Sequence, residues 1–593
     1  MRYVSALGRL DRWGLRPAYA LRRTLAAGYH GRDLARDALA GLVVAVVALP
    51  LSMALAIASG VPPQHGLDTA IVAGAVVALL GGSMTQVSGP TAAFVVLLAP
   101  LSARLGLGGL LLASLLAGLI LLGMGLFRMG RLIEFIPHPV TTGFTAGIAV
   151  VIATLQLKDF LGLRVAGSDH FVARVEALIR ALPTLRPVEL GVGMATLLLL
   201  VAWPRLTSGR IPAALIALGL VTTVTTVLTR TVPGFQVETI AGRFGEIPAH
   251  FPSFDWPWNA TGPDGAPIHL GFGTLRELLP SAFAIALLGA IESLLCAVVS
   301  DGMTGTRHDP DAELLALGAG NLLAPFFGGF AATGAIARTT VNIRSGGRSP
   351  FASAFHAVFL LLAMLLAAPV LGKLPLAGMA ALLLTVAWRM AEGKHFLHIL
   401  RVAPRSDVAV LLACFSLTVL FDMVVGVTVG VVLAALLLMR RMSEVFRTRA
   451  LVSGDEGAHP ALPRGAVVYE IAGPLFFGAA QKAIQALQYV GDHSRVVILD
   501  MHHVPVLDVT GLVALESAIA RLHKRKALVI LGPAAAVPGA GPLRAPGRAG
   551  EAAVRRLDAG GGGPGPGGDH SLGRAPGDHR RSAAARPRLI RSP

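Results

Sequence analysis

The sequence predicts a mainly α-helical membrane protein with about fourteen transmembrane segments, followed by a small cytoplasmic α/β domain. Hydrophobic residues make up 54% of the 593 residues and charged residues only 14%, against roughly 45–50% and 25% in soluble proteins. Apolar segments of membrane-spanning length recur up to Met439, and short strands alternate with helical periodicity after Arg449. This pattern excludes a soluble enzyme, a disordered chain and a disulfide scaffold.

The charges and cysteines do not indicate a nucleic-acid or metal protein. The net charge is +17, but the arginines lie mainly at the ends of apolar segments and near the C-terminus, so we expect no nucleic-acid partner. Cys296 and Cys414 both lie inside apolar runs, where they form neither a metal site nor a redox framework. We expect no cofactor, no metal and no enzymatic activity.

The transmembrane domain is expected to cover residues 38–441, after an arginine-rich cytoplasmic segment at residues 1–37. The apolar run from Ala38 continues past Ile57, which is too long for the core of a removable signal peptide and long enough to span a bilayer. Further apolar segments lie at about 67–82, 90–103, 108–127, 138–157, 188–203, 211–229, 278–299, 312–327, 333–343, 351–371, 374–391, 406–421 and 423–439.

The distribution of Lys and Arg between the loops predicts that both termini are cytoplasmic, in a multi-pass protein of the cell (inner) membrane. Loops after even-numbered segments are basic, as at Arg128 and Arg131, whereas the opposite loops, such as residues 59–66, are nearly free of basic residues. Residues 158–186 are the exception, because they carry Lys and Arg in a loop expected on the outer side.

The C-terminal region is expected to comprise a linker at 442–462, a partial α/β domain at 463–533 and a low-complexity tail at 534–593. The domain has strands predicted at Val467–Ile471, Arg495–Met501 and Ala527–Leu531, and helices at 477–490 and 510–524. The tail consists mainly of Ala, Gly, Arg and Pro without an aromatic residue, so we expect it to be disordered.

Two weakly hydrophobic segments in matching positions of two halves predict a binding site. They are Ser88–Phe94 and Gly328–Arg338, and each starts about 50 residues after the first segment of its half. This spacing suggests a repeat of seven plus seven segments, and an odd number per half makes the halves inverted. A helix that begins inside the membrane presents unpaired N–H groups and a partial charge of about +0.5, so two such helices facing each other would bind an anion. Close packing of small residues is the structural alternative.

The residue types in these segments suit an anion site. Pro90 fits the first turn of a helix, where an N–H group would be unpaired anyway. Hydroxyl donors and small residues that let an anion approach the backbone make up the rest: Ser88, Thr91 and Thr333, with Gly89, Ala92, Gly334 and Ala335.

Two charged residues lie within apolar segments. A charge at bilayer depth costs roughly 2.5–3.5 kcal/mol or more, so we expect Arg338 to bind the anion; a structural ion pair or a side chain reaching the membrane edge are the alternatives. Glu292 is expected to carry a coupling proton, with a role in a cation site or a permanent pair with Arg338 as alternatives.

From about Asp33 to Pro533, the sequence resembles the sulfate permease (SulP) family of anion transporters. The resemblance rests on VALPLSMALAIASGVPPQHGL at 47–67, GGSMTQVSGPTAAFVV at 81–96 and LLGAIESLLCAVVSDGMTGTRH at 287–308. The C-terminal domain resembles the STAS domain (sulfate transporter and anti-sigma-factor antagonist) of that family. Residues 287–308 and 334–344 are most similar to the bacterial C4-dicarboxylate branch.

The resemblance implies a core domain that moves against a gate domain, with the anion between Ser88–Ala92 and Thr333–Arg338 and with Arg338 beside it. It also implies a homodimer whose STAS domains take part in assembly or regulation, with a possible cytoplasmic partner. Sodium-coupled members have an Asp, and a Thr four positions later, where this chain has Glu292 and Cys296. A thiol is a poor sodium ligand, so the departure favours H⁺ over Na⁺ as the coupling ion.

The STAS resemblance is incomplete. Asp508–Leu512 matches the motif whose hydroxyl residue, here Thr510, is phosphorylated in anti-sigma-factor antagonists. The family pattern continues beyond Pro533, whereas this chain changes abruptly in composition. A frameshift or gene-model error explains such a break, and a true truncation with a disordered tail is the alternative.

These features lead us to expect a secondary active transporter for proton-coupled uptake of C4-dicarboxylates, with a small anion and the lipid bilayer as partners. Transport of sulfate or bicarbonate is the alternative within the family. A membrane-anchored STAS signalling or scaffold protein is the alternative from another class.

Overall fold

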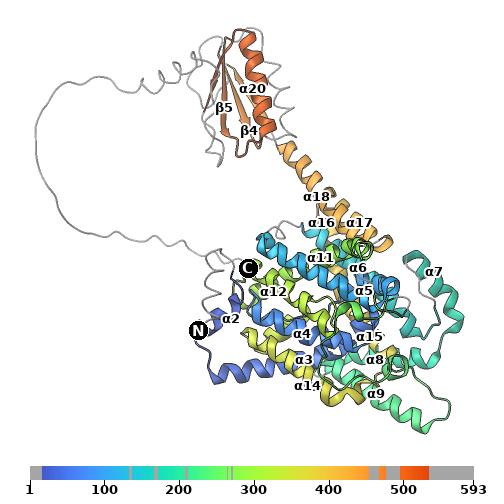
Figure 1. The fold of residues 1–593 in the computed structure, drawn as a ribbon. Helices are drawn as coiled ribbons and strands as arrows, with labels where there is room; N and C mark the ends of the chain where they lie inside the picture. Colours follow the sequence, from blue (N-terminus) through green and yellow to red (C-terminus); the bar gives the residue numbers. More distant parts are fainter. Residues whose placement is uncertain are drawn as a thin grey trace, which may run out of the picture. The chain divides into compact units, whose positions relative to one another are not determined.

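The structure, a computed structural model, describes residues 16–131, 137–165, 171–206, 212–262, 265–268, 271–421, 423–445, 447–452, 466–475 and 495–532. The chain divides into two units, Met1–Arg441 and Met442–Pro593 (Figure 1). The expected helix at 477–490, the tail at 534–593 and parts of segments 1–37 and 442–462 lie outside the described residues.

The first unit consists of long apolar helices, as the sequence predicts. Nine of the described helices are long and apolar enough to cross a membrane. The first half contains α3 (Gly31–Ala58), α4 (Gln64–Leu80), α5 (Ala92–Leu126), α6 (His138–Leu161), α8 (Pro187–Leu206) and α9 (Ala213–Thr231). The second half contains α11 (Phe272–Thr304), α12 (Pro310–Leu323), α13 (Ile336–Arg344), α14 (Pro350–Leu371), α15 (Leu376–Met390), α17 (Arg405–Leu420) and α18 (Met423–Val445).

Helix α5 consists of two of the expected segments, joined at a bend. Gly106 has a non-helical φ of 65° within it. A Cβ atom at this position would lie 2.6 Å from the carbonyl oxygen of Thr261, and the N–H of Gly108 donates to that oxygen. Only glycine fits both the backbone conformation and this close approach. With α5 counted as two, each half contains seven of the described segments, in agreement with the expected repeat.

The helices pack into two groups that mix the halves of the sequence. In the first group, α3 and α4 pack against α14, α4 and α5 against α12, and α5 and α13 against α11. In the second group, α6 packs against α15 and α17, and α8 packs against α9 and α15. Contacts between the groups are less extensive and involve α3 with α15 and α9, and α5 with α6.

Three short helices carry polar faces: α2 (Tyr19–Ala26), α7 (Phe171–Ala181) and α16 (Gly393–Val402). Helix α7 gives a physical reason for the basic residues of 158–186. It buries Leu178 and Ala181, while Arg180 is exposed and donates to Glu176. Part of this basic charge therefore belongs to an amphipathic helix, whose charged face needs no burial.

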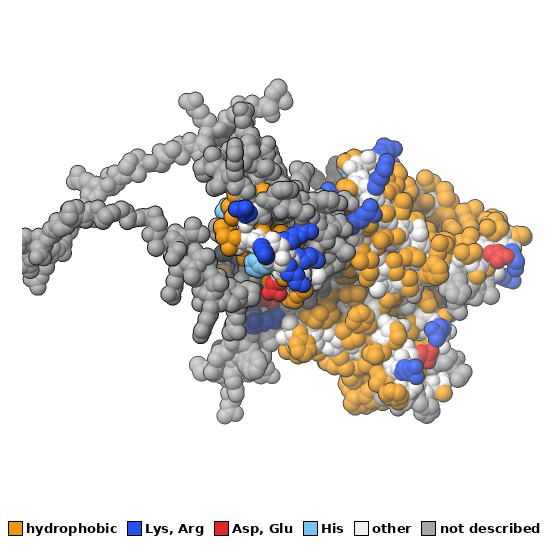
Figure 2. Space-filling model, turned by 90° about the horizontal axis from the view of Figure 1, so that it is seen from above, with side chains coloured by type: hydrophobic (Ala, Val, Ile, Leu, Met, Phe, Trp, Pro, Cys, Tyr) orange, Lys and Arg blue, Asp and Glu red, His pale blue; other side chains and the backbone are white. Residues whose placement is uncertain are grey.

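The surface of the first unit is mostly apolar. Figure 2 shows hydrophobic side chains over most of the visible face of the helices, with acidic and basic groups in only a few places. Trp388 and Leu366 are 83% and 80% exposed. Large apolar side chains in such numbers on a surface indicate contact with lipid rather than water.

The second unit is a small α/β domain with a four-stranded sheet in the order β3-β4-β5-β6. The strands β4 (Ala466–Ala472), β5 (Val496–His503) and β6 (Leu528–Leu531) are parallel, and α20 (Val509–Lys524) contributes Leu515 and Leu522 to their core. These elements coincide with the predicted ones. Strand β3 (Arg447–Val452) lies in the range expected to be a linker and pairs antiparallel with β4.

Close packing of α5 against α12 depends on two glycines, Gly118 and Gly318. A Cβ atom at Gly118 would lie 2.5 Å from the backbone nitrogen of Leu322, and one at Gly318 would lie 2.6 Å from that of Leu122. Neither backbone can retreat without separating the helices.

We predict that Gly118→Ala lowers the free energy of unfolding by about 1–3 kcal/mol, because it overpacks this contact. The matched control is Gly123→Ala on the same helix, where a Cβ atom meets nothing within 4 Å; it should be neutral or stabilising by up to about 1 kcal/mol. Thermal unfolding in detergent measures both variants, and equal midpoints would contradict the prediction.

Candidate functional site

The two weakly hydrophobic segments meet inside the first unit. Ser88–Gly89 form strand β1, Thr333–Gly334 form strand β2, and the two strands pair antiparallel with Ser88 opposite Gly334. The N–H of Ala335 extends the pairing by donating to the carbonyl oxygen of Val87. Residues some 250 positions apart in the sequence thus form one structure, with one strand from each half.

A helix begins directly after each strand. Helix α5 starts at Ala92 with Thr91 as its N-cap residue, and α13 starts at Ile336 with Ala335 as its N-cap residue. Neither start, both within the described ranges, has a side-chain hydrogen bond that caps it. The first N–H groups of both helices therefore remain available, and the partial positive charge of each helix start is not offset by a cap.

Arg338 lies in the first turn of α13 and is only 1% exposed. Its Nη2 donates to the carbonyl oxygen of Pro90 at 2.9 Å and to the hydroxyl oxygen of Ser52 at 3.3 Å. Among the described residues, its Nε and Nη1 have no hydrogen-bond partner. A buried guanidinium with two unsatisfied nitrogens can donate further hydrogen bonds to an acceptor such as an oxyanion.

Glu292 lies on α11 and is half-buried. Its Oε2 accepts a hydrogen bond of 2.9 Å from the hydroxyl of Thr91, the N-cap residue of α5. Glu292 and Arg338, both in the described part of the chain, form no ion pair, so a permanent pair is not what holds them. The carboxylate is instead tied to the start of the helix that faces Arg338.

The remaining predicted residues differ in what their side chains do. The Thr333 hydroxyl donates to the carbonyl oxygen of Gly289 at 2.8 Å, so it is directed at α11. The Ser88 hydroxyl is buried without a partner among residues with described positions. The Cys296 thiol lies 3.2 Å from the hydroxyl oxygen of Thr339. Ala92 and Ala335 are buried, whereas Ile336 is 42% exposed, so the first turn of α13 borders accessible space.

Gly89 brings the backbone against the guanidinium. A Cβ atom at this position would lie 2.4 Å from Nη1 of Arg338. Any other residue here would force the guanidinium away from β1, which explains why glycine stands at this position.

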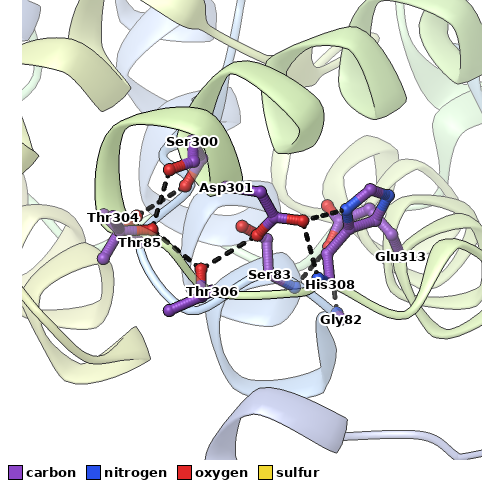
Figure 3. A network of polar contacts seen from close by, with 9 residues as sticks. All are labelled: Gly82, Ser83, Thr85, Ser300, Asp301, Thr304, Thr306, His308 and Glu313. Carbon is purple, nitrogen blue, oxygen red and sulfur yellow. Dashed lines mark hydrogen bonds and ion pairs between the residues drawn. The ribbon is translucent and has the colours of Figure 1, made fainter. Parts of the chain in front are cut away.

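Sequence reasoning missed a buried carboxylate that holds the loop before β1. Glu313 of α12 is 1% exposed, and its Oε2 accepts from the N–H groups of Gly82 and Ser83 at 2.9 and 3.1 Å (Figure 3). Its Oε1 accepts from Gln86 at 2.7 Å and from Ser293 at 3.2 Å. The sequence did contain a sign of this role, because Glu313 is a charged residue in an apolar run. Glu313 lies close to the expected start of that segment, however, where a charged residue is ordinary.

A second polar cluster closes the end of α11 next to the same loop. The hydroxyl oxygens of Thr85 and Ser300 are 2.6 Å apart. One Asp301 oxygen accepts from Thr306, and the other accepts from the N–H of His308 and lies 2.7 Å from its Nδ1 (Figure 3). The Thr85–Ser300 contact joins the loop that precedes β1 to α11, and the Asp301 contacts hold the connection from α11 to α12.

In the second unit, Thr510 is exposed in the first turn of α20. Asp508, two residues before Thr510, caps this helix by accepting a hydrogen bond of 2.7 Å from the N–H of Gly511. The hydroxyl is therefore accessible in this unit, as a modification site would require.

Comparisons with known proteins agree with this architecture. The sequence profile of the sulfate permease family matches residues 34–414, and that of the STAS domain matches residues 461–537. The putative sulfate transporter YvdB of Bacillus subtilis is 39% identical over 85% of this chain and 92% of its own length. The bicarbonate transporter BicA of Picosynechococcus is 30% identical over 85% of this chain and 90% of its own length.

A solved structure shares the fold. The structure of the murine anion transporter Slc26a9 in the inward-facing state superposes with a TM-score of 0.77, covering 88% of each chain at 20% sequence identity. The relatives found by sequence are named as transporters and not as enzymes.

We predict that Gly89→Ala raises the half-saturating concentration of the transported anion at least tenfold, an effect of about 1.4 kcal/mol, because the new methyl group displaces Nη1 of Arg338. Gly302→Ala on α11 is the control, since a Cβ atom there meets nothing within 4 Å. Initial uptake rates in proteoliposomes over a range of anion concentrations provide the measurement. An unchanged half-saturating concentration in Gly89→Ala would show that Arg338 does not contact the anion.

Proposed function

Because this chain belongs to the sulfate permease family and is a membrane anion transporter of that type, we propose that it imports a small dianion together with a proton. The observation that carries the proposal is Arg338, whose Nε and Nη1 have no partner within the described ranges at the place where two uncapped helix starts meet. The site residues in this proposal are Ser88–Ala92, Thr333–Ala335 and Arg338, with Glu292 and Cys296 beside them.

The position of Glu292 supports its proposed role as the group that binds the coupling proton. Its carboxylate is hydrogen-bonded to Thr91, at the same helix start that would bind the anion. An ionised Glu292 repels a bound dianion, whereas a protonated Glu292 does not. Binding of the anion and binding of the proton therefore favour each other, and by linkage the two effects are equal in free energy. This coupling makes uptake proton-driven without any covalent step.

Alternating access requires the site to move as a unit. Arg338, Pro90, Ser52, Thr91 and Glu292 all belong to the helix group of α3–α5 and α11–α14, and their hydrogen bonds stay within it. The second helix group contributes none of the described hydrogen bonds of these side chains. We propose that the first group carries the anion past the second, in an inner-membrane protein with both termini cytoplasmic.

The cargo is proposed to be a C4-dicarboxylate, which is what the sequence of residues 287–308 and 334–344 favours. The names of the relatives favour sulfate or bicarbonate as the second candidate. We further propose a homodimer, with the STAS unit acting in assembly or regulation. A STAS scaffold without transport would have no use for an unpaired buried guanidinium.

Direct uptake distinguishes the cargo candidates. Purified protein in proteoliposomes with an inward proton gradient should accumulate radiolabelled succinate, and unlabelled fumarate should compete with it. Uptake should fall at least about tenfold in Arg338→Ala, which loses charge-assisted bonds worth about 1.5–3 kcal/mol. Accumulation of sulfate or bicarbonate without succinate would move the protein to the second candidate, and no anion uptake at all would overturn the proposal.

We predict that Glu292→Gln removes the dependence of anion binding on pH, because glutamine resembles the protonated acid and cannot release a proton. The wild type should bind the anion more weakly as the pH rises, whereas the variant should bind equally over the same range. Anion-dependent thermal stabilisation at several pH values measures this without requiring transport. Asp407→Asn on α17, outside the site, serves as the control. A pH dependence that persists in Glu292→Gln would assign coupling to another group.

A further inference from the structure

The start of α4 carries three polar residues on one face. His65, Asp68 and Thr69 follow the spacing i, i+3 and i+4, so they line one side of the helix. All three lie against residues 328–330, the chain segment that leads into β2. This end of α4 follows the short loop after α3, which is outside the cell in the proposed topology.

Two of the three residues hold the segment by hydrogen bonds. The Nδ1 atom of His65 lies 2.8 Å from the carbonyl oxygen of Gly328, so His65 donates there. The Thr69 hydroxyl oxygen accepts from the N–H of Phe330 at 2.8 Å, and its own proton goes to the carbonyl oxygen of His65 at 2.7 Å. The segment is thus fixed to α4 three residues before Thr333.

Asp68, between them, has no such bond. The residue is 6% exposed, and its Oδ1 is buried without a hydrogen-bond partner among the described residues. Its Oδ2 is 4.0 Å from Nδ1 of His65. A Cβ atom at Gly328 would lie 3.3 Å from Oδ2 and 3.2 Å from Nδ1, so the segment packs closely over both side chains. An ionised carboxylate in this position would be strongly unfavourable without a paired cation.

Other charged groups on the neighbouring elements are directed elsewhere. Ser52 and Ala56 are the residues of α3 next to the start of α4, and the charged residues of α3 lie in its first two turns. On α12, Asp311 bonds Gly130 and Glu313 bonds the loop after α4. On α14, both ring nitrogens of His356 are buried without a hydrogen-bond partner among the described residues, so His356 forms no bond to Asp68. Helix α2, which carries basic residues, begins next to the other end of α4, where the N–H of Ala18 donates to the carbonyl oxygen of Leu80. η4 (Ala324–Phe327) has no titratable residue. Among the residues with described positions, His65 is the one basic group within 4.0 Å of the Asp68 carboxylate.

We propose that Asp68 is a second proton-binding site of the transporter, loaded from the outer side through His65. The protonated acid is neutral and lets residues 328–330 seat against α4. Loss of this proton leaves a carboxylate whose nearest counter-ion, within the described ranges, is a protonated His65. His65 then has to leave the carbonyl oxygen of Gly328 or share its donor. The proton on Asp68 thereby governs the segment that ends in β2. This inference rests on the proposed proton-coupled function and adds a proton site to it.

Infrared titration of the full-length protein in lipid tests the site with protons alone. The wild type should show carbonyl bands of protonated carboxylic acids that disappear as the pH rises. Asp68→Asn should remove one of these components, and Glu292→Gln should remove another. Asp255 is an exposed aspartate between α9 and α11, so Asp255→Asn is the control and should leave the bands unchanged. A spectrum of Asp68→Asn identical to that of the wild type would overturn the inference.

His65→Gln keeps the test decisive if Asp68→Asn fails to fold. Glutamine still offers a donor to Gly328 but cannot become a cation, so deprotonation of Asp68 loses its counter-ion. The midpoint of the Asp68 band should move to higher pH by at least about half a unit, a threefold change in proton affinity. An unmoved midpoint would contradict the role of His65.

The two proposals fail separately. If Glu292→Gln loses one component while Asp68→Asn keeps every component of the wild type, proton coupling at Glu292 is supported and the second site is overturned. If Asp68→Asn loses one component but anion binding by the wild type does not depend on pH, the second site is supported and proton coupling at Glu292 is overturned. In a coupled wild type, the number of protons taken up per succinate should fall in Asp68→Asn.

Discussion

The burial of one guanidinium is the constraint on which the centre of this molecule depends. Arg338 is held by a backbone carbonyl and one hydroxyl, next to two helix starts that are themselves partly positive. A positive charge at membrane depth beside two like partial charges is unfavourable unless negative charge balances it. In the described part of the chain, the carboxylate bonded to the start of α5 is that of Glu292. The remaining imbalance is what an anionic cargo would neutralise.

Interrupting two helices in a membrane leaves backbone groups without helical partners, and buried polar side chains replace those partners. Glu313 accepts from Gly82 and Ser83, Thr339 accepts from the N–H of Val87, and Asn321 bonds both the N–H and the carbonyl group of Ala332. These side chains come from α12 and α13, so the broken segments cannot shift without their neighbours. The proposed anion site is in this way fixed within one helix group.

The sequence allowed the charged residues of the site to be predicted but not their partners. Arg338 and Glu292 stand out because each is a costly charge inside an apolar run, and short Gly-rich segments identify the two breaks. Ser52, by contrast, is 286 positions from Arg338, and Thr91 is 201 positions from Glu292, so no local pattern joins them. Thr333 has the residue type of an anion ligand, yet its hydroxyl bonds Gly289, because the nearest acceptor is decided by packing. The amphipathic helix α7 likewise obscured the loop-charge rule, which counts charges without regard to helices lying between spans.

In the proposed site, the charge of the transported anion and the protonation of Glu292 depend on each other. Arg338 and two helix starts contribute roughly two positive charges, at about half a charge for each helix. With Glu292 ionised the net charge is about +1, which suits a monovalent anion such as bicarbonate and requires no proton. With Glu292 protonated it is about +2, which suits sulfate or a dicarboxylate. If Glu292 has the proposed role, a dianion therefore brings a proton with it for electrostatic reasons, whereas a monovalent anion does not. The valence of the cargo then determines whether Glu292 couples its movement to protons.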